Sequence, residues 1–284
     1  MPYVSELVTG DWPDASDWDD HLDVEEHILR PAVRVEDLWI RYRTTSESST
    51  TLKEALTARR GRVKSAQYVE ALRGVSFDVP AGGVYGVIGH NGAGKSTLFR
   101  TIAGILAPTE GRVTVAGRVT PLLSLGVGFN RELTGRENIL LGGLATGLQT
   151  DEIMAHYDEV VSFADLGPAL DYPMRTYSSG MYARLGFAVA SHLDPDIMLI
   201  DEALSAGDGR FKKRCMDKLV ELCGRDCTVM VISHGLGLIK YLAERCVWLE
   251  AGQVRMEGLG ADVVDAYLTS DDMRDDDVAA MDDF

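Results

Sequence analysis

The chain has 284 residues, 45% of them hydrophobic, and a formal net charge of −16 at pH 7. This length holds one large α/β domain or two small ones, and the hydrophobic content is ordinary for a soluble protein. No run approaches the ~18 to 20 apolar residues that span a bilayer. The acidic N-terminus is also unlike a secretory signal peptide, so we expect the protein to stay in the cytoplasm.

The negative charge is concentrated at the two ends of the sequence. Residues 1–30 contain nine acidic residues and one basic residue, and residues 271–284 contain seven and one. Acidic ends repel DNA, RNA and anionic lipid, so no direct binding of nucleic acid is expected. We predict a disordered extension over residues 1–31, one domain over residues 32–270, and an acidic tail over residues 271–284.

The first two predicted strands are separated by an insertion. Residues 33–42 and 71–79 show the alternation of β-strands, whereas residues 44–67 do not. Within the insertion, residues 52–64 have apolar positions on one helical face and several basic residues. Two interpretations remain open: a basic helix against a membrane or a membrane partner, and a solvated surface insertion.

A predicted phosphate-binding loop follows the next strand. Residues 84–88 form an apolar run that leads into G-H-N-G-A-G-K-S-T and then into a predicted helix, residues 95 to about 106. The glycines allow backbone amides to converge on one anion at the positive end of the helix, the lysine can reach β- and γ-phosphates, and the serine hydroxyl can ligate Mg²⁺. The candidate residues are Gly89, His90, Asn91, Gly92, Ala93, Gly94, Lys95, Ser96 and Thr97.

The middle of the chain is predicted to be largely α-helical. Strands are expected at residues 112–115 and 118–119, and residues 121–129 show no clean period. A helical region then begins at residue 133, with Thr134 or Gly135 as N-cap, and continues to about residue 170. After it, Ser178, Ser179, Gly180 and Met181 begin another helix. A hydroxyl group and open amides at a helix N-terminus form a second candidate anion site, although the pattern taken alone favours an ordinary N-cap.

Two further strands are predicted to end in polar groups at one edge of a sheet. The apolar residues 197–200 lead directly into Asp201 and Glu202, and residues 228–232 lead into Ser233 and His234. Ligands of α/β sheets bind at the carboxyl ends of such strands. Asp201 is placed to hold Mg²⁺, Glu202 to polarise a water, and His234 to approach a γ-phosphate. A hairpin over residues 246–254 and a last helix over residues 261–269 complete the predicted elements.

Four cysteines lie in or beside apolar segments: Cys215, Cys223, Cys227 and Cys246. The spacing of Cys223 and Cys227 is compatible with metal ligation, but no second matched pair accompanies them. We therefore expect reduced, buried thiols.

These motifs, in this order, resemble the ATPase subunit of ABC (ATP-binding cassette) transporters. The resemblance implies an α/β fold: a P-loop NTPase (RecA-like) core with an antiparallel β subdomain and an α-helical subdomain over about residues 130–180. It implies ATP and Mg²⁺ as cofactors. It also implies that Lys95, Glu202 and His234 are catalytic and that Ser96 and Asp201 bind the metal. Two copies are then expected to pair head to tail, with Ser178 to Met181 of one copy binding the ATP held by the other. Asp208 then lies in the interface loop.

Departures from the usual family pattern narrow the resemblance. The signature reads Y-S-S-G-M, and the usual glutamine loop is replaced by a leucine-glycine stretch before T-G-R-E-N. In these features the chain is similar to the ATPases of exporters of O-antigen, teichoic acid, capsule and galactan polysaccharides. Ser124 and Leu125 are weak candidates for the missing glutamine. The family stacks adenine on an aromatic ring, for which Tyr42 and Tyr68 remain alternatives.

The resemblance implies a peripheral bacterial protein at the cytoplasmic face of the cytoplasmic membrane. Its partners would be a second copy of itself and a separate polytopic permease that carries a lipid-linked polysaccharide. An alternative is a soluble ABC-type ATPase that acts as a switch without a transport partner. A P-loop kinase is disfavoured, because it explains neither Ser178 to Gly180 nor His234.

Overall fold

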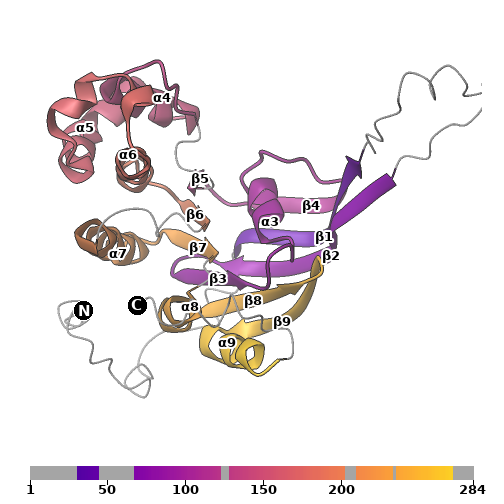
Figure 1. The fold of residues 1–284 in the computed structure, drawn as a ribbon. Helices are drawn as coiled ribbons and strands as arrows, with labels where there is room; N and C mark the ends of the chain where they lie inside the picture. Colours follow the sequence, from indigo (N-terminus) through magenta and orange to yellow (C-terminus); the bar gives the residue numbers. More distant parts are fainter. Residues whose placement is uncertain (1–30, 45–66, 123–127, 202–208, 233–234, 271–284) are drawn as a thin grey trace, which may run out of the picture.

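A computed structural model describes residues 31–44, 67–122, 128–201, 209–232 and 235–270 (Figure 1). The predictions for the two acidic ends and for a helix within residues 52–64 lie outside these ranges. The described residues form a three-stranded sheet, a six-stranded sheet and the helices that pack on them.

The three-stranded sheet is antiparallel. Strand β1 (Pro31–Thr44) lies between β2 (Gln67–Pro80) and β4 (Glu110–Val115). Alternate residues of β1 are buried, including Val33 and Val35, because one face of the sheet covers the core while the other faces solvent. The strands predicted at residues 33–42, 71–79 and 112–115 are confirmed, and each extends beyond its predicted bounds. The predicted antiparallel β sheet is likewise present.

The six-stranded sheet has the order β5-β6-β7-β3-β8-β9. All neighbouring pairs are parallel except β8 and β9, which form the predicted hairpin. The central strands are apolar along their length because both of their faces are covered. The bounds are β3 (Val84–Ile88), β5 (Val119–Leu122), β6 (Ile197–Asp201), β7 (Thr228–Ile232), β8 (Arg245–Glu250) and β9 (Gln253–Leu259).

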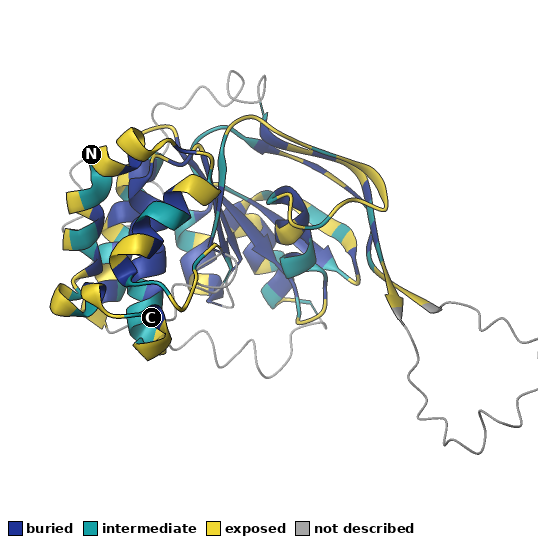
Figure 2. Cartoon of the chain, turned by 90° about the horizontal axis from the view of Figure 1, so that it is seen from above, coloured by how far each residue is buried: buried dark blue, intermediate teal, exposed yellow. Residues whose placement is uncertain are grey.

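Successive side chains along these strands point to opposite faces of the sheet, so the core has two layers. On β6, Ile197 and Leu199 pack with helix α3 (Lys95–Ile102) and with the antiparallel sheet. Met198 and Ile200 face the opposite side, where they pack with α7 (Gly209–Cys223), α8 (Leu236–Leu242) and α9 (Gly260–Leu268). The strands between these two layers are largely buried (Figure 2).

The predicted helical region forms a buried cluster of its own. It contains α4 (Gly135–Ala145), α5 (Thr150–Ala164), the 3₁₀ turns η2 (Gly167–Asp171) and η3 (Met174–Thr176), and α6 (Ser179–His192). Figure 1 shows these helices beyond the β5–β6 edge of the sheet. Helix α6 belongs both to this cluster and to the layer of α7, so it joins the helical region to the sheet.

Three helices differ from the sequence-based expectations. Helix α3 ends at Ile102 rather than near residue 106, because Gly104 adopts a left-handed conformation with φ of 71°. Helices α7 and α8 were not assigned from sequence: the first is strongly basic at its start, and the second has only seven residues. Among the described helices, none has the length and apolar character needed to cross a bilayer.

The four cysteines are free thiols. Cys215, Cys227 and Cys246 are buried and Cys223 is partly buried. Burial raises the pKa of Cys215, Cys227 and Cys246 to about 12, and that of Cys223 to about 11. Such thiols stay protonated near neutral pH and are poor nucleophiles.

Candidate functional site

The predicted phosphate loop joins β3 to α3 at the carboxyl edge of the large sheet. Its glycines, Gly89, Gly92 and Gly94, have φ angles of 141°, 85° and 108°. These values are unfavourable for residues with a Cβ atom, which explains the glycines. The loop therefore leads its backbone to the N-terminus of α3, where the amides of the first turn have no intrahelical partner and can bind an anion.

Lys95 lies inside this loop. Its side chain is only 6% exposed, and its Nζ donates to the carbonyl oxygens of Gly89 at 2.5 Å and His90 at 3.1 Å. The ammonium group is thus held on the concave side of the loop by its own backbone. Phosphate oxygens would be alternative acceptors for the same donor.

The backbone of β8, of the β8–β9 turn and of β2 packs closely against the phosphate loop. A Cβ at Gly89 would lie 2.1 Å from the carbonyl oxygen of Leu249, and one at Gly94 would lie 2.7 Å from that of Ala71. The β8–β9 turn also holds the loop, since the Gly252 amide donates to the Ala93 carbonyl at 3.0 Å. Sequence reasoning missed these supports, because no local signal in the hairpin identifies the loop as its neighbour.

The parallel sheet brings the ends of three predicted site strands to one edge. Strand β7 lies between β6 and β3, and Asp201 is opposite Ile232 in the β6–β7 ladder. Asp201 therefore ends its strand on the edge where the phosphate loop begins. Glu202, Asp208, His234 and the weak candidates Ser124 and Leu125 lie outside the described residues.

The loop and this edge together fit a magnesium nucleotide. The loop supplies amide donors and one cation for phosphate oxygens, while Ser96 and Asp201 supply the oxygen ligands that Mg²⁺ prefers. Ser96 is partly buried in the first turn of α3. Gly92 leaves space on the outer side of the loop, because a Cβ there would meet no atom within 4 Å.

The two candidate adenine-stacking tyrosines lie on opposite faces of the β1–β2 pair. Tyr42 is opposite Val69, and Tyr68 is opposite Arg43. Directly opposed residues share a face and successive residues alternate, so the two rings point to different sides. The Tyr42 hydroxyl lies 3.4 Å from Thr97 Oγ1 at the end of the phosphate loop motif. The ring of Tyr42 therefore borders the loop, whereas that of Tyr68 lies on the other face.

The second predicted anion site begins helix α6. Ser178 is the N-cap, and its Oγ accepts from the Met181 amide at 3.2 Å. Ser178 and Ser179 are exposed, and a Cβ at Gly180 would find only Ser178 Oγ, 4.0 Å away. Ser178 thus acts as an ordinary N-cap. Space nevertheless remains beside Gly180 at this end of the helix, where a ligand could bind.

The segment before α4 packs directly beside the segment before α6. The Met174 amide donates to the Leu133 carbonyl at 2.9 Å, and Thr134 and Pro173 form an isolated β-bridge. Tyr177 bonds through its hydroxyl to the Ala169 carbonyl at 2.8 Å. The two sequence features that depart from the usual family pattern, T-G-R-E-N and Y-S-S-G-M, are therefore neighbours in space.

Within T-G-R-E-N, the polar residues stabilise the start of α4. Thr134 and Glu137 form a capping box, in which the Glu137 carboxylate accepts from the Thr134 amide at 2.8 Å. These hydrogen bonds lower the pKa of Glu137. Asn138 is fully buried and donates to three carbonyls, those of Asn130, Leu133 and Thr134.

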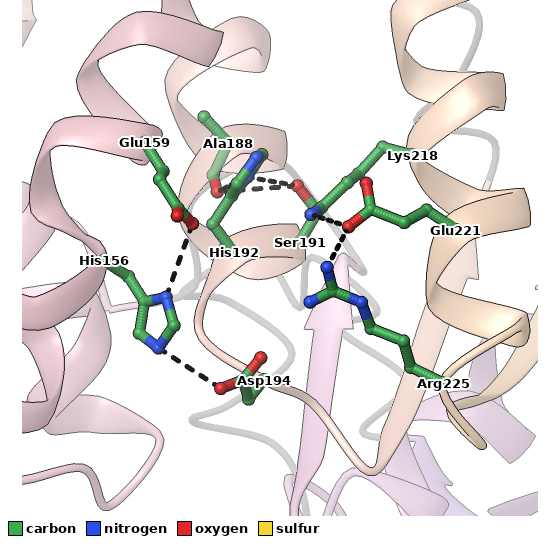
Figure 3. Close-up of polar contacts among 9 residues, drawn as sticks. All are labelled: His156, Glu159, Ala188, Ser191, His192, Asp194, Lys218, Glu221 and Arg225. Carbon is green, nitrogen blue, oxygen red and sulfur yellow. Dashed lines mark hydrogen bonds and ion pairs between the residues drawn. The ribbon is translucent and has the colours of Figure 1, made fainter.

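Polar contacts within α5, α6 and α7 gather around the far end of α6 (Figure 3). Nδ1 of the buried His192 lies 3.0 Å from the Ala188 carbonyl, which identifies it as the protonated nitrogen. Burial and the nearby Lys218 cation lower the pKa of His192. His156 of α5 contacts Asp194 just beyond the helix at 3.2 Å. The His156–Asp194 contact thus joins α5 to the segment that follows α6.

Comparison with known proteins identifies the family. The family model described as "ABC transporter" matches residues 72–205. The O-antigen export system ATP-binding protein RfbB of Klebsiella pneumoniae is 40% identical over 205 residues, 72% of this chain and 83% of that protein. This chain belongs to the ATP-binding proteins of ABC transporters. The predicted family is confirmed.

Other members of the ABC family share the exporter names. RfbB of Myxococcus xanthus is 43% identical over 230 residues, covering 80% of this chain and 53% of that protein. The teichoic acids export ATP-binding protein TagH of Bacillus anthracis is 44% identical over 206 residues, covering 72% of this chain and 37% of that protein. The chain thus spans about half or less of the length of these two relatives. The predicted similarity to polysaccharide exporter ATPases is confirmed.

Solved structures of ABC proteins confirm the fold class. The structure of the ATP-binding subunit of an ABC transporter superposes with a TM-score of 0.67 at 22% identity, covering 83% of this chain and 93% of that one. A dimeric ATP-binding cassette in a post-hydrolysis state superposes with a TM-score of 0.64 at 20% identity, covering 80% of this chain and 98% of that one. At these identities the likeness concerns the ABC ATPase fold alone.

Proposed function

We propose that this chain is the ATP-hydrolysing motor subunit of an ABC exporter that moves a lipid-linked cell-envelope polysaccharide across the cytoplasmic membrane. The observation that carries the proposal is the phosphate loop geometry with the buried Lys95, in a chain 40% to 44% identical to proteins named for O-antigen and teichoic acid export. The contact between T-G-R-E-N and Y-S-S-G-M gives further support, because these are the two features typical of that subfamily.

Within one chain, each site residue has a distinct proposed role. The loop amides and Lys95 bind the β- and γ-phosphates, and Ser96 and Asp201 hold Mg²⁺. Bound Mg²⁺ would neutralise charge on the phosphates. Glu202 accepts a proton from the attacking water, and His234 contacts the γ-phosphate. Tyr42 stacks on adenine, since its ring borders the loop.

The open N-terminus of α6 supports a composite site between two copies. Ser178 and the amide of Gly180 would bind the γ-phosphate that the partner copy holds in its own phosphate loop, aided by the positive helix end. ATP would then join the two copies, and hydrolysis would release them. Asp208 is assigned to the same interface.

The transport proposal requires a membrane partner. We expect the protein to sit at the cytoplasmic face of the membrane on a separate polytopic permease, which carries the polysaccharide. The test is to solubilise native membranes in mild detergent, capture the tagged chain, and identify what co-purifies. A stoichiometric polytopic membrane protein supports the exporter. Recovery from the soluble fraction alone favours the second candidate, a soluble ABC-type ATPase switch.

The catalytic assignment has its own test. Glu202→Gln should keep ATP binding, slow hydrolysis by on the order of 100-fold or more, and accumulate an ATP-held dimer, because loss of a general base removes about 10²- to 10⁴-fold. Glu159→Gln, an exposed carboxylate on α5, is the matched control. Undiminished turnover of the Glu202 variant would remove that residue from the catalytic role.

A further inference from the structure

Tyr182 lies in the first turn of α6, one helical turn after Ser178. Its amide donates to the Ser178 carbonyl at 3.0 Å, which is the first hydrogen bond of the helix. Side chains of a helix lean toward its N-terminus, so the partly exposed Tyr182 ring covers the turn that Ser178 begins. The contacts of this ring therefore bear directly on the position of Ser178.

Two residues of one short segment, residues 129–131, contact the ring. Phe129 meets it edge to face, with ring centroids 5.8 Å apart and an interplanar angle of 69°. The Arg131 guanidinium lies over the ring, with Cζ 5.6 Å from the ring centroid. Both contacts involve the aromatic ring of Tyr182 and not its hydroxyl group, so a phenylalanine at this position would retain them.

This segment is itself held by α4 and by the residues before α6. The Asn130 amide donates to Asn138 Oδ1 at 2.7 Å, and Asn138 Nδ2 donates to the Asn130 carbonyl at 2.9 Å. The Arg131 carbonyl accepts from the Arg175 amide at 2.8 Å. Asn138 is fully buried in α4, where such a hydrogen-bonded amide is a rigid anchor. The ring contacts of Tyr182 therefore tie the first turn of α6 to a segment with a fixed position on α4.

The first turn of α6 benefits from such support. The first amides of a helix have no intrahelical partner, and helix ends open more easily than helix centres. The hydrogen bond from the Met181 amide to Ser178 Oγ is internal to the turn, so it does not set the orientation of the turn relative to α4. A site for a phosphate group requires donors at fixed positions.

We propose that Tyr182 is a positioning residue for the composite ATP site. Its contacts with Phe129 and Arg131 keep the first turn of α6 in one orientation. In that orientation Ser178 and the Gly180 amide bind the γ-phosphate held by the partner copy. The inference rests on the composite site of the proposed function. Because Tyr182 acts through Ser178, its loss should affect the pairing of two copies and not the binding of ATP by a single copy.

The test measures ATP-dependent pairing of full-length chains that carry Glu202→Gln, by analytical ultracentrifugation over a range of protein concentrations. Tyr182→Leu keeps an apolar side chain but loses the ring. It should raise the dissociation constant of the ATP-held dimer at least fivefold, because it removes an aromatic pair and a cation–π contact together. ATP affinity, measured with a fluorescent analogue at protein concentrations too low for pairing, should change by less than about twofold.

Two control variants accompany this measurement. Tyr182→Phe retains both ring contacts and should pair as the unsubstituted chain does. Tyr157→Leu is the same change at a partly exposed tyrosine of α5 that packs on the same buried cluster, and it should alter the dimer dissociation constant by less than about twofold. Pairing of Tyr182→Leu equal to that of the Tyr157 control would overturn the proposal. A loss of ATP affinity as large as the loss of pairing would indicate a general effect on the fold and would also overturn it.

Arg131→Ala provides an independent variant at an exposed position. Alone it should weaken pairing about two- to fivefold, as for an exposed cation–π contact, and in the Tyr182→Leu background it should have no further effect. An equal loss in both backgrounds would show that Arg131 acts without Tyr182, against the proposal. If Ser178→Arg abolishes pairing while Tyr182→Leu does not, the composite site stands and the positioning role alone fails. If Ser178→Arg pairs normally, the composite site fails and the inference fails with it.

Discussion

The hydroxyl group of Tyr177 occupies the space that a side chain at Gly135 would need. A Cβ at Gly135 would lie 2.3 Å from that hydroxyl and 2.9 Å from Leu170 Cδ2. The tyrosine of Y-S-S-G-M thus requires the glycine of T-G-R-E-N. A larger residue at position 135 would therefore disturb the packing between the starts of α4 and α6.

This relationship predicts energetic coupling. Gly135→Ala should lower the free energy of unfolding by about 1–3 kcal/mol, because overpacking forces neighbours to shift. In a Tyr177→Leu background the cost of the same change should be smaller by more than ~0.5 kcal/mol, as expected for residues in contact. Urea denaturation of the four proteins measures this. Gly237→Ala in α8, which would meet no atom within 4 Å, is the control. Additive effects of the two changes would contradict the contact.

The opposite orientations of Tyr42 and Tyr68 predict unequal effects on ATP binding. Tyr42→Ala should weaken ATP binding by between about fivefold and a hundredfold, because stacking of a base on an aromatic ring is worth ~1–3 kcal/mol. Tyr68→Ala, on the other face of the same strand pair, should change the affinity by less than about twofold. Titration of each variant with a fluorescent ATP analogue gives the comparison. A larger loss for Tyr68 would reverse the assignment.

A composite site predicts that Ser178→Arg binds ATP but does not dimerise. Ser178 is exposed, so the new side chain need not disturb the core, yet its bulk would collide with the partner's nucleotide. Size-exclusion chromatography with ATP, in the Glu202→Gln background, should show monomers. Met154→Arg adds the same charge at an exposed position of α5 and should still dimerise. An ATP-dependent dimer of the Ser178 variant would argue against the composite site.

The lowered pKa of His192 predicts acid sensitivity. The unfolded chain, with an ordinary histidine pKa of about 6.5, binds a proton that the folded chain resists, so stability falls as pH decreases below that value. One such group contributes a slope of at most ~1.4 kcal/mol per pH unit. His192→Asn keeps a donor toward the Ala188 carbonyl and should have a shallower slope between pH 7 and pH 5 in urea denaturation. Equal slopes would show that another group is responsible.

Elements with strong local patterns were predicted well. The bounds of β3 agree with the sequence, because an apolar run before glycines is a local signal. Of the two N-cap candidates for α4, Thr134 and Gly135, the structure has Thr134, which stands three residues before a glutamate. Helices α7 and α8 gave no comparable signal. The basic start of α7 hides its apolar stripe, and α8 has fewer than three turns.

The sequence by itself determined the family, the phosphate loop and the strand ends that carry candidate site residues, since these depend on residue types at fixed spacing within single segments. Only the tertiary structure decided which tyrosine borders the loop, that the β8–β9 turn supports it, and that Gly135 faces Tyr177. Each of these relationships joins segments distant in sequence. They arise from strand register and close packing, which no single segment encodes.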